Sequence, residues 1–163
     1  RAMTAPVLVF GYGNPSRGDD ALGPEFVRRL EMRCADAIAG GTLEVLTDFQ
    51  LQVEHALDLR GREQVYFVDA TTEAGAPGYA VRAVVAAHDV AFTTHALSPA
   101  ALLQTYDTVV GGPAPAAFVI AIRGEQFELG EAVSADAELR LAAALDDFVE
   151  RLGRRGGRAP ALT

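Results

Sequence analysis

Residues 7–10 form an unbroken apolar run, Val-Leu-Val-Phe, that ends at a glycine-rich turn. A strand that is apolar at every position is typical of the interior of a sheet, where both faces of the strand are buried. Similar runs at 65–68 and 118–122 predict two more buried strands. Segments with helical spacing of apolar residues alternate with these runs, so the chain is expected to fold as an α/β protein with a mainly parallel sheet.

The other elements follow from periodicity and from turn residues. A helix is expected after Asp19 and Asp20, because the apolar residues between 22 and 34 share one face and Pro24 falls in the first turn. The 71–78 connection is too short for a crossover helix, so the strand after it should be antiparallel. We therefore predict a five-stranded, mainly parallel sheet with one antiparallel strand and helices on both faces. The expected strands are 7–10, 43–47, 65–68, 79–85 and 118–122, and the expected helices begin near residues 20, 53, 98 and 134.

Composition indicates a single globular domain. The chain has 163 residues, of which 50% are hydrophobic and 22% are charged, which is ordinary for one folded domain. We expect residues 6–153 to form this domain. Residues 1–5 are expected to be disordered and residues 154–163 to form a flexible tail, where glycine and arginine are frequent.

Charge and cysteine content restrict the partners and the compartment. The formal net charge of −8 argues against nucleic-acid binding, which favours a basic surface. The sequence contains no apolar run of membrane-spanning length and no signal-peptide pattern, so we expect no membrane association. The single cysteine, Cys34, cannot form an internal disulfide. These features predict a cytoplasmic protein.

The glycine-rich turn at 11–18 does not match a phosphate-binding loop. The dinucleotide fingerprint needs a glycine at position 16, where this chain has Ser16, and the Walker pattern is absent. Asp19 and Asp20 stand where a phosphate would bind, and two carboxylates would repel that anion. The turn is better suited to presenting carboxylates than to binding phosphate.

Polar residues follow strands or precede helices at several points of the predicted fold. In an open α/β sheet, such positions gather at the carboxyl ends of the strands, where ligands bind. Two carboxylates and one histidine would suit a divalent ion such as zinc, nickel or cobalt. The residues placed in this way are Asn14, Asp19, Asp20, Asp48, Asp69 and His95.

Each of these residues also has a purely structural interpretation. Asp19 and Asp20 are neighbours whose side chains diverge by about 100° on a helix, so one can cap the helix while the other faces the ligand site. Asp69 can close an Asx turn, and His95 can be a hydrogen-bonding loop residue. The other two histidines, His55 and His88, are interpreted as structural or exposed.

Common hydrolase motifs are missing. The chain has neither a Gly-x-Ser-x-Gly elbow nor a His-Glu-x-x-His zinc motif. Cys34 lies on the apolar face of the first predicted helix, so it is expected to pack in the core rather than to act as a nucleophile.

Residues 11–23, Gly-Tyr-Gly-Asn-Pro-Ser-Arg-Gly-Asp-Asp-Ala-Leu-Gly, resemble the opening signature of the hydrogenase maturation endopeptidases. That signature is Gly-x-Gly-Asn, a four-residue spacer, two acidic residues, and a glycine three positions after the second acid. Residues 67–70, an apolar strand closed by Asp69-Ala70, resemble the second signature, and His95 before a helix resembles the third. The order and spacing agree from about residue 7 to residue 152.

The resemblance implies a function as well as a twisted five-stranded sheet. It implies an endopeptidase, metal-dependent or aspartyl in type, that removes a C-terminal extension from the large-subunit precursor of a nickel–iron hydrogenase. The catalytic and metal-contacting positions of the family correspond to Asp20, Asp69 and His95. Nickel would arrive with the precursor, which is the expected partner, and need not be a resident cofactor.

This sequence departs from the family pattern at two informative places. The second acid is Asp20, where many members have glutamate, and the shorter side chain would draw the metal closer. Residues 48–51 read Asp-Phe-Gln-Leu, where many members have Asp-Gly-Gly-Thr. Two other functions use the same three residues: a non-proteolytic maturation chaperone that checks metal loading, and a small-molecule hydrolase with a resident metal.

Overall fold

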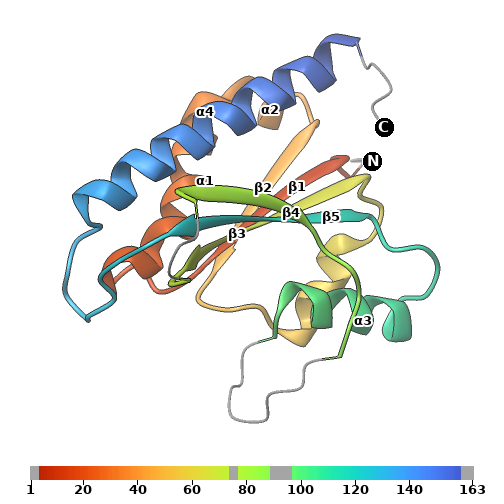
Figure 1. The fold of residues 1–163 in the computed structure, drawn as a ribbon. Coiled ribbons are helices and arrows are strands. Elements are labelled where there is room, and N and C mark those ends of the chain that lie inside the picture. The colour runs from red at the N-terminus through yellow and green to blue at the C-terminus, as the bar shows by residue number, and fades with distance from the viewer. Residues whose placement is uncertain (1–3, 74–76, 89–96, 159–163) are drawn as a thin grey trace.

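The computed structural model of the chain describes residues 4–73, 77–88 and 97–158. In this part of the chain, five strands form one sheet in the order β2-β1-β3-β5-β4 (Figure 1). All neighbouring strands are parallel except β4 and β5, which are antiparallel. This arrangement confirms the predicted fold class. The strands are β1 (Val7–Tyr12), β2 (Leu43–Asp48), β3 (Gln64–Thr71), β4 (Tyr79–Ala83) and β5 (Ala116–Arg123).

Helices cover both faces of the sheet and enclose two separate cores (Figure 1). One core contains Phe26, Leu141 and Phe148, and the other contains Phe10 and Leu102. Every one of these five side chains is at most 4% exposed, so both faces of the central strands are buried as their apolar runs predict. The first core lies under α1 (Leu22–Arg33), α2 (Ala35–Ala39) and α4 (Ala135–Arg158), and the second under η2 (Val53–Leu59) and α3 (Pro99–Val109).

Two helices differ from the predicted ones in detail. The helix expected to include Cys34 ends at Arg33, because the backbone of Cys34 leaves the helical region and α2 begins after it. The expected helix near residue 53 is a 3₁₀ helix, η2, whose first turn is closed by a hydrogen bond from the Gln52 N–H to His55 Nδ1 at 2.8 Å. The helix predicted from Ser98 is present as α3, and the Ser98 hydroxyl accepts a hydrogen bond from the Ala101 N–H at 3.1 Å.

Packing extends beyond both expected domain boundaries. Residues 1–5 are predicted to be disordered, yet Ala5 is only 6% exposed and its carbonyl accepts a hydrogen bond from Arg62 at 2.9 Å. Helix α4 continues to Arg158, five residues past the expected domain end at 153. An ion pair between Glu150 and Arg154, one helical turn apart, supports this last stretch.

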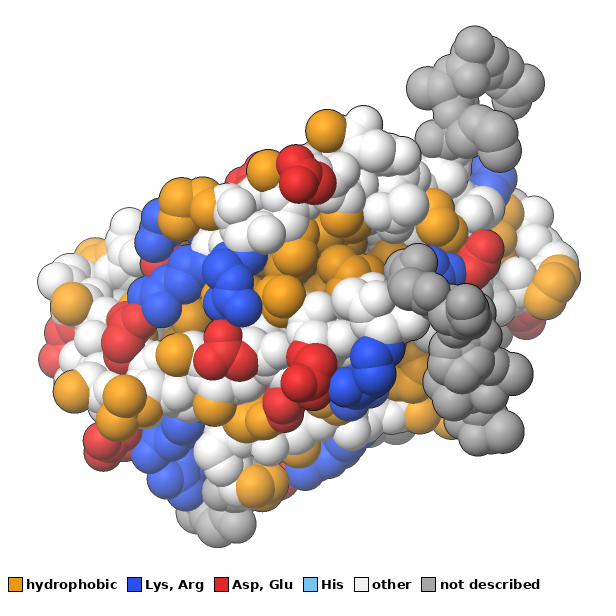
Figure 2. Space-filling view, turned by 90° about the horizontal axis from the view of Figure 1, so that it is seen from above, with side chains coloured by type: hydrophobic (Ala, Val, Ile, Leu, Met, Phe, Trp, Pro, Cys, Tyr) orange, Lys and Arg blue, Asp and Glu red, His pale blue; other side chains and the backbone are white. Residues whose placement is uncertain are grey.

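The face formed by α1 and α4 carries charged side chains of both signs among apolar ones, as Figure 2 shows from above. On this face, Arg33 of α1 pairs with Asp146 of α4 at 2.9 Å. No helix in the described ranges is long and apolar enough to cross a membrane.

Candidate active site

Three polar residues lie side by side at the carboxyl ends of neighbouring strands: Asp48 on β2, Tyr12 on β1 and Asp69 on β3. Tyr12 is the register partner of Asp48, and Asp69 directly follows Val68, the partner of Gly11. Successive side chains of a strand alternate between the two faces of the sheet. Because Phe10 and Phe67 lie two residues earlier on the face of η2 and α3, Tyr12 and Asp69 point to that face as well.

Asp20 reaches the same edge of the sheet from a 3₁₀ turn, η1 (Gly18–Ala21), which leads into α1. Its Oδ2 accepts a hydrogen bond from the Asn14 N–H at 2.7 Å. Gly13 makes this approach possible, because a Cβ at that position would lie 2.0 Å from the Asp20 carbonyl oxygen. The glycine-rich turn thus holds a carboxylate against the end of β1, as the sequence indicates.

Asp20 and Asp69 interact electrostatically across the end of the sheet. The pKa of Asp69 is raised to about 6, chiefly because burial disfavours the charged carboxylate. Hydrogen bonds from the Tyr12 hydroxyl and the Ala70 N–H oppose this rise, whereas the negative charge of Asp20 adds to it. Two carboxylates in this arrangement favour binding of a proton or a cation between them.

Asp19 has a different role from its neighbour. Its side chain is completely buried and accepts hydrogen bonds from the backbone N–H groups of Glu125, Gln126 and Ser134 and from the Ser134 hydroxyl. Burial alone would raise the pKa of Asp19, but these hydrogen bonds outweigh burial and lower it below its usual value. The two acids therefore divide into a structural residue, Asp19, and a residue at the candidate site, Asp20.

His95 lies outside the described residues, so the structure brings together two of the three predicted ligands. The chain re-enters the described part at Leu97, whose N–H donates to the carbonyl of Leu51, three residues after β2 ends, at 3.4 Å. Within the described part, no cluster of three histidine, cysteine or acidic side chains could hold a metal ion. Convergence of Asp20, Asp69 and His95 remains a prediction.

Two contacts at this edge of the sheet were not predicted from the sequence. Tyr12 is expected only as part of a turn, yet its hydroxyl binds Asp69, and burial followed by the charge of Asp69 raises its pKa far above the usual value. His55 Nε2 lies 3.2 Å from Asp48 Oδ2. Since His55 Nδ1 accepts the Gln52 N–H, the hydrogen of the neutral ring is on Nε2, the ring nitrogen nearer to Asp48. The sequence does contain one signal for the position of His55: Gln52 and His55 have the Gln-x-x-His spacing with which two side chains cap the start of a helix.

The structural interpretations of His55, His88 and Cys34 are confirmed. His55 caps η2, and its ring contacts Phe10 edge to face with 4.7 Å between centroids. His88 is exposed. Cys34 packs against the core under α1 and α4, where burial raises the pKa of its thiol and disfavours a reactive thiolate.

Replacing Tyr12 with phenylalanine is expected to raise the pKa of Asp69 further and to leave the fold intact. The substitution removes one hydroxyl, and with it a hydrogen bond that favours the charged carboxylate. At pH 8 the unfolding free energy should fall by about 1 kcal/mol, the usual net value of one hydrogen bond. NMR titration of the Asp69 carboxyl carbon measures the first effect. Tyr66→Phe, which removes a hydroxyl that bonds Gln64 instead, should leave that titration unchanged.

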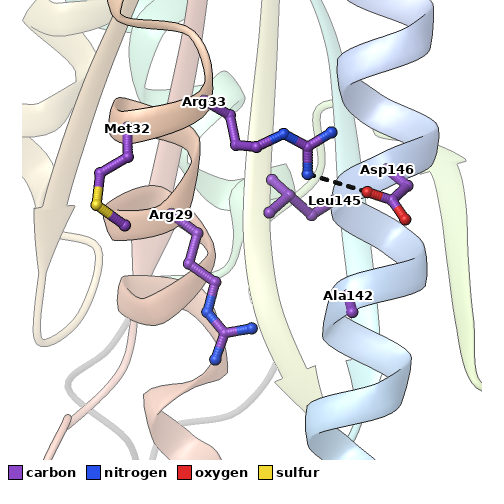
Figure 3. Close-up of a pocket in the computed structure, with 6 residues that line it drawn as sticks. All are labelled: Arg29, Met32, Arg33, Ala142, Leu145 and Asp146. Carbon is purple, nitrogen blue, oxygen red and sulfur yellow. Dashed lines mark hydrogen bonds and ion pairs between the residues drawn. The ribbon is translucent and has the colours of Figure 1, made fainter.

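A groove of about 360 Å³ between α1 and α4 is separate from this site (Figure 3). Its floor includes Leu145, which belongs to the core on the opposite face of the sheet from Tyr12. Its two arginines are already paired, Arg33 with Asp146 and Arg29 with Glu25 at 2.9 Å each. We therefore assign the candidate site to the carboxyl ends of the strands.

The fold is similar to that of several hydrogenase maturation proteases. The [NiFe] hydrogenase maturation protease HycI from Thermococcus kodakarensis superimposes with a TM-score of 0.70 at 21% identity, over 91% of this chain and 93% of that one. The hydrogenase maturating endopeptidase HybD from E. coli gives 0.69 at 22% identity, over 92% and 93%. A hydrogenase 2 maturation peptidase from a Thaumarchaeota archaeon gives 0.61 at 22% identity, over 90% and 97%.

These similarities cover nearly the whole of each chain, so the fold of this protein is the one seen in those proteases. The sequence itself matches no protein-family model and no curated protein.

Proposed function

We propose that this protein is an endopeptidase that removes a C-terminal extension from the nickel-loaded large-subunit precursor of a nickel–iron hydrogenase. The observation that carries the proposal is the pair of interacting carboxylates, Asp20 and Asp69, at the strand ends of a fold shared with hydrogenase maturation proteases. The spacing of the motif at 11–23 supports the same function. A cytoplasmic location is part of the proposal.

In this proposal, nickel belongs to the substrate. The repulsion between Asp20 and Asp69 is relieved when a divalent cation lies between them, so a precursor that carries nickel binds more tightly than an empty one. His95 would supply a nitrogen ligand, which suits nickel as well as zinc. The bound ion would place the C-terminal segment of the precursor beside the site and could polarise a carbonyl or a water molecule as a Lewis acid.

The decisive experiment is mass spectrometry of a purified precursor before and after incubation with this protein, with and without nickel. We expect the precursor to lose its C-terminal extension only when it is nickel-loaded. His95→Ala and Asp20→Asn should abolish the cleavage, since each removes a ligand. Cys34→Ala is the control: it should lower the unfolding free energy by about 1 kcal/mol and preserve cleavage.

The two alternative functions give different results in the same set of measurements. A maturation chaperone would bind the nickel-loaded precursor without shortening it. A hydrolase with a resident metal would retain stoichiometric zinc or another divalent ion after dialysis. Full cleavage by His95→Ala, or loss of cleavage in a folded Cys34→Ala protein, would show that the site is elsewhere.

A further inference from the structure

We propose that Asp19 is a positioning residue that holds the Asp20 carboxylate at the site through a link to the connection between β5 and α4, residues 124–134. The inference rests on the proposed function, in which Asp20 contacts the metal of the precursor. It assigns a role in that reaction to a residue that does not itself face Asp69, and to a segment more than one hundred positions away in the sequence.

The Asp19 carboxylate is the anchor of this link. Oδ2 accepts hydrogen bonds from the Glu125 N–H at 2.7 Å, the Gln126 N–H at 3.2 Å and the Ser134 hydroxyl at 2.7 Å, and Oδ1 accepts the Ser134 N–H at 2.7 Å. The side chain is 0% exposed, so water cannot replace these donors. Hydrogen bonds to a buried charged acceptor are stronger than neutral ones.

The backbone reinforces the same connection. The Asp19 N–H donates to the Gln126 carbonyl at 2.7 Å, and the Gly18 N–H donates to the Glu131 carbonyl at 3.0 Å. Gly124 lies so close that a Cβ there would be 2.6 Å from the Asp19 Cβ. Residues 124–134 therefore hold η1 in position in addition to the hydrogen bonds of its own short turn.

Asp20 has little freedom to move independently of Asp19. It is the next residue of the same 3₁₀ turn, and its N–H donates to the Arg17 carbonyl at 3.0 Å. Its carboxylate is tied to the Asn14 N–H at 2.7 Å. A shift of η1 would carry Asp20 away from Asn14 and Asp69, and displacements of about 1 Å are enough to impair a reacting site.

The chemistry of position 19 requires a carboxylate. All four partners are donors, and an ionised aspartate presents only acceptors. An asparagine would turn its NH₂ group toward at least one of these N–H or O–H groups. Ser134 offers a milder perturbation, since its hydroxyl contributes one of the four bonds and it is far from Asp20 in sequence.

The test compares Ser134→Ala, Ser134→Thr and Asp19→Asn with wild type by amide hydrogen exchange. The reporter is the Asn14 N–H, because its bond to Asp20 Oδ2 is lost when that carboxylate moves. Its exchange rate is divided by that of the Val9 N–H in the centre of β1, which removes effects of global stability. We expect the ratio to rise about tenfold in Ser134→Ala and more in Asp19→Asn, and to return toward wild type in Ser134→Thr, which keeps the hydroxyl.

The matched control is Asp136→Asn, an exposed change in the first turn of α4. It perturbs the same helix end without touching Asp19 and should leave the ratio unchanged. An unchanged ratio in both Ser134→Ala and Asp19→Asn, or an equal rise in Asp136→Asn, would overturn the inference.

Cleavage of the nickel-loaded precursor separates this inference from the proposed function. If wild type cleaves, the rate per folded molecule should fall in Ser134→Ala and Asp19→Asn in parallel with the exchange ratio. A normal rate in folded Asp19→Asn would overturn the positioning role. If wild type does not cleave while the exchange ratio still responds, the link between Asp19 and Asp20 stands and the proteolytic function fails.

Discussion

Replacing Asp69 with asparagine is expected to abolish cleavage of the nickel-loaded precursor and, at the same time, to stabilise the metal-free protein. Burial raises the pKa of Asp69 to about 6 in the folded state, whereas the unfolded value is 3.8. Above pH 6 the folded protein therefore carries an unfavourable charge, and this penalty vanishes below about pH 4, where both states are protonated. At pH 8 the unfolding free energy should rise by about 2 kcal/mol.

Urea unfolding at pH 8 and at pH 4 measures this difference. The gain should be present at pH 8 and absent at pH 4. Asp48→Asn is the matched control, because Asp48 lies at the carboxyl end of β2 in the same row, but its side chain is 38% exposed and its Oδ2 lies 3.2 Å from His55 Nε2. It should not stabilise the protein. Reduced stability of Asp69→Asn at pH 8 would contradict the interpretation of Asp20 and Asp69 as a destabilised pair that favours a cation.

Replacing Gly13 with alanine is expected to damage both the fold and the site. Gly13 has a φ of +145°, a conformation that L residues rarely adopt, and a Cβ there would lie 2.0 Å from the Asp20 carbonyl oxygen. Backbone strain and the clash together should lower the unfolding free energy by about 3 kcal/mol. Because η1 must move to admit the methyl group, cleavage should be lost even under conditions where the variant is fully folded.

Gly41→Ala distinguishes backbone strain from the clash at the site. Gly41 also has a positive φ, +80°, but no atom lies within 4 Å of the position that a methyl group would take there. This variant should lose about 1 kcal/mol and cleave the precursor normally. Comparable cleavage by Gly13→Ala and Gly41→Ala would show that the close approach of Gly13 to Asp20 is unimportant.

The fold could be predicted from local patterns because each strand carries its own signal. The runs at 7–10 and 65–68 are apolar at every position, and burial on both faces is the only way to remove them from water. The short connection before Tyr79 was enough to predict the antiparallel direction of β4. The break at Cys34 and the 3₁₀ form of η2 were not predictable, since helical spacing alone does not report where a backbone departs from α geometry.

The site could be predicted only in part, and the reason is sequence distance. Asp69 was expected directly after a strand and Asp20 directly before a helix, so the general rule for parallel sheets placed both at one edge. The resemblance assigned Asp20 to that edge, but spacing alone left Asp19 and Asp20 equivalent, because their roles depend on Glu125 and Ser134, more than one hundred residues away. The contact of Tyr12 with Asp69 depends on the register of β1 against β3, which no local pattern determines.

Helix α4 connects the two ends of the molecule, and this has a practical consequence for assays. It begins beside the Asp19 carboxylate through Ser134, and near its other end Arg155 pairs with Glu63, which precedes the first residue of β3. The end of α4 therefore lies at the amino ends of the strands, away from Asp20 and Asp69. A tag or a surface attachment joined after α4 would leave the site facing the solution, so that immobilised protein could capture a bulky precursor without obstruction.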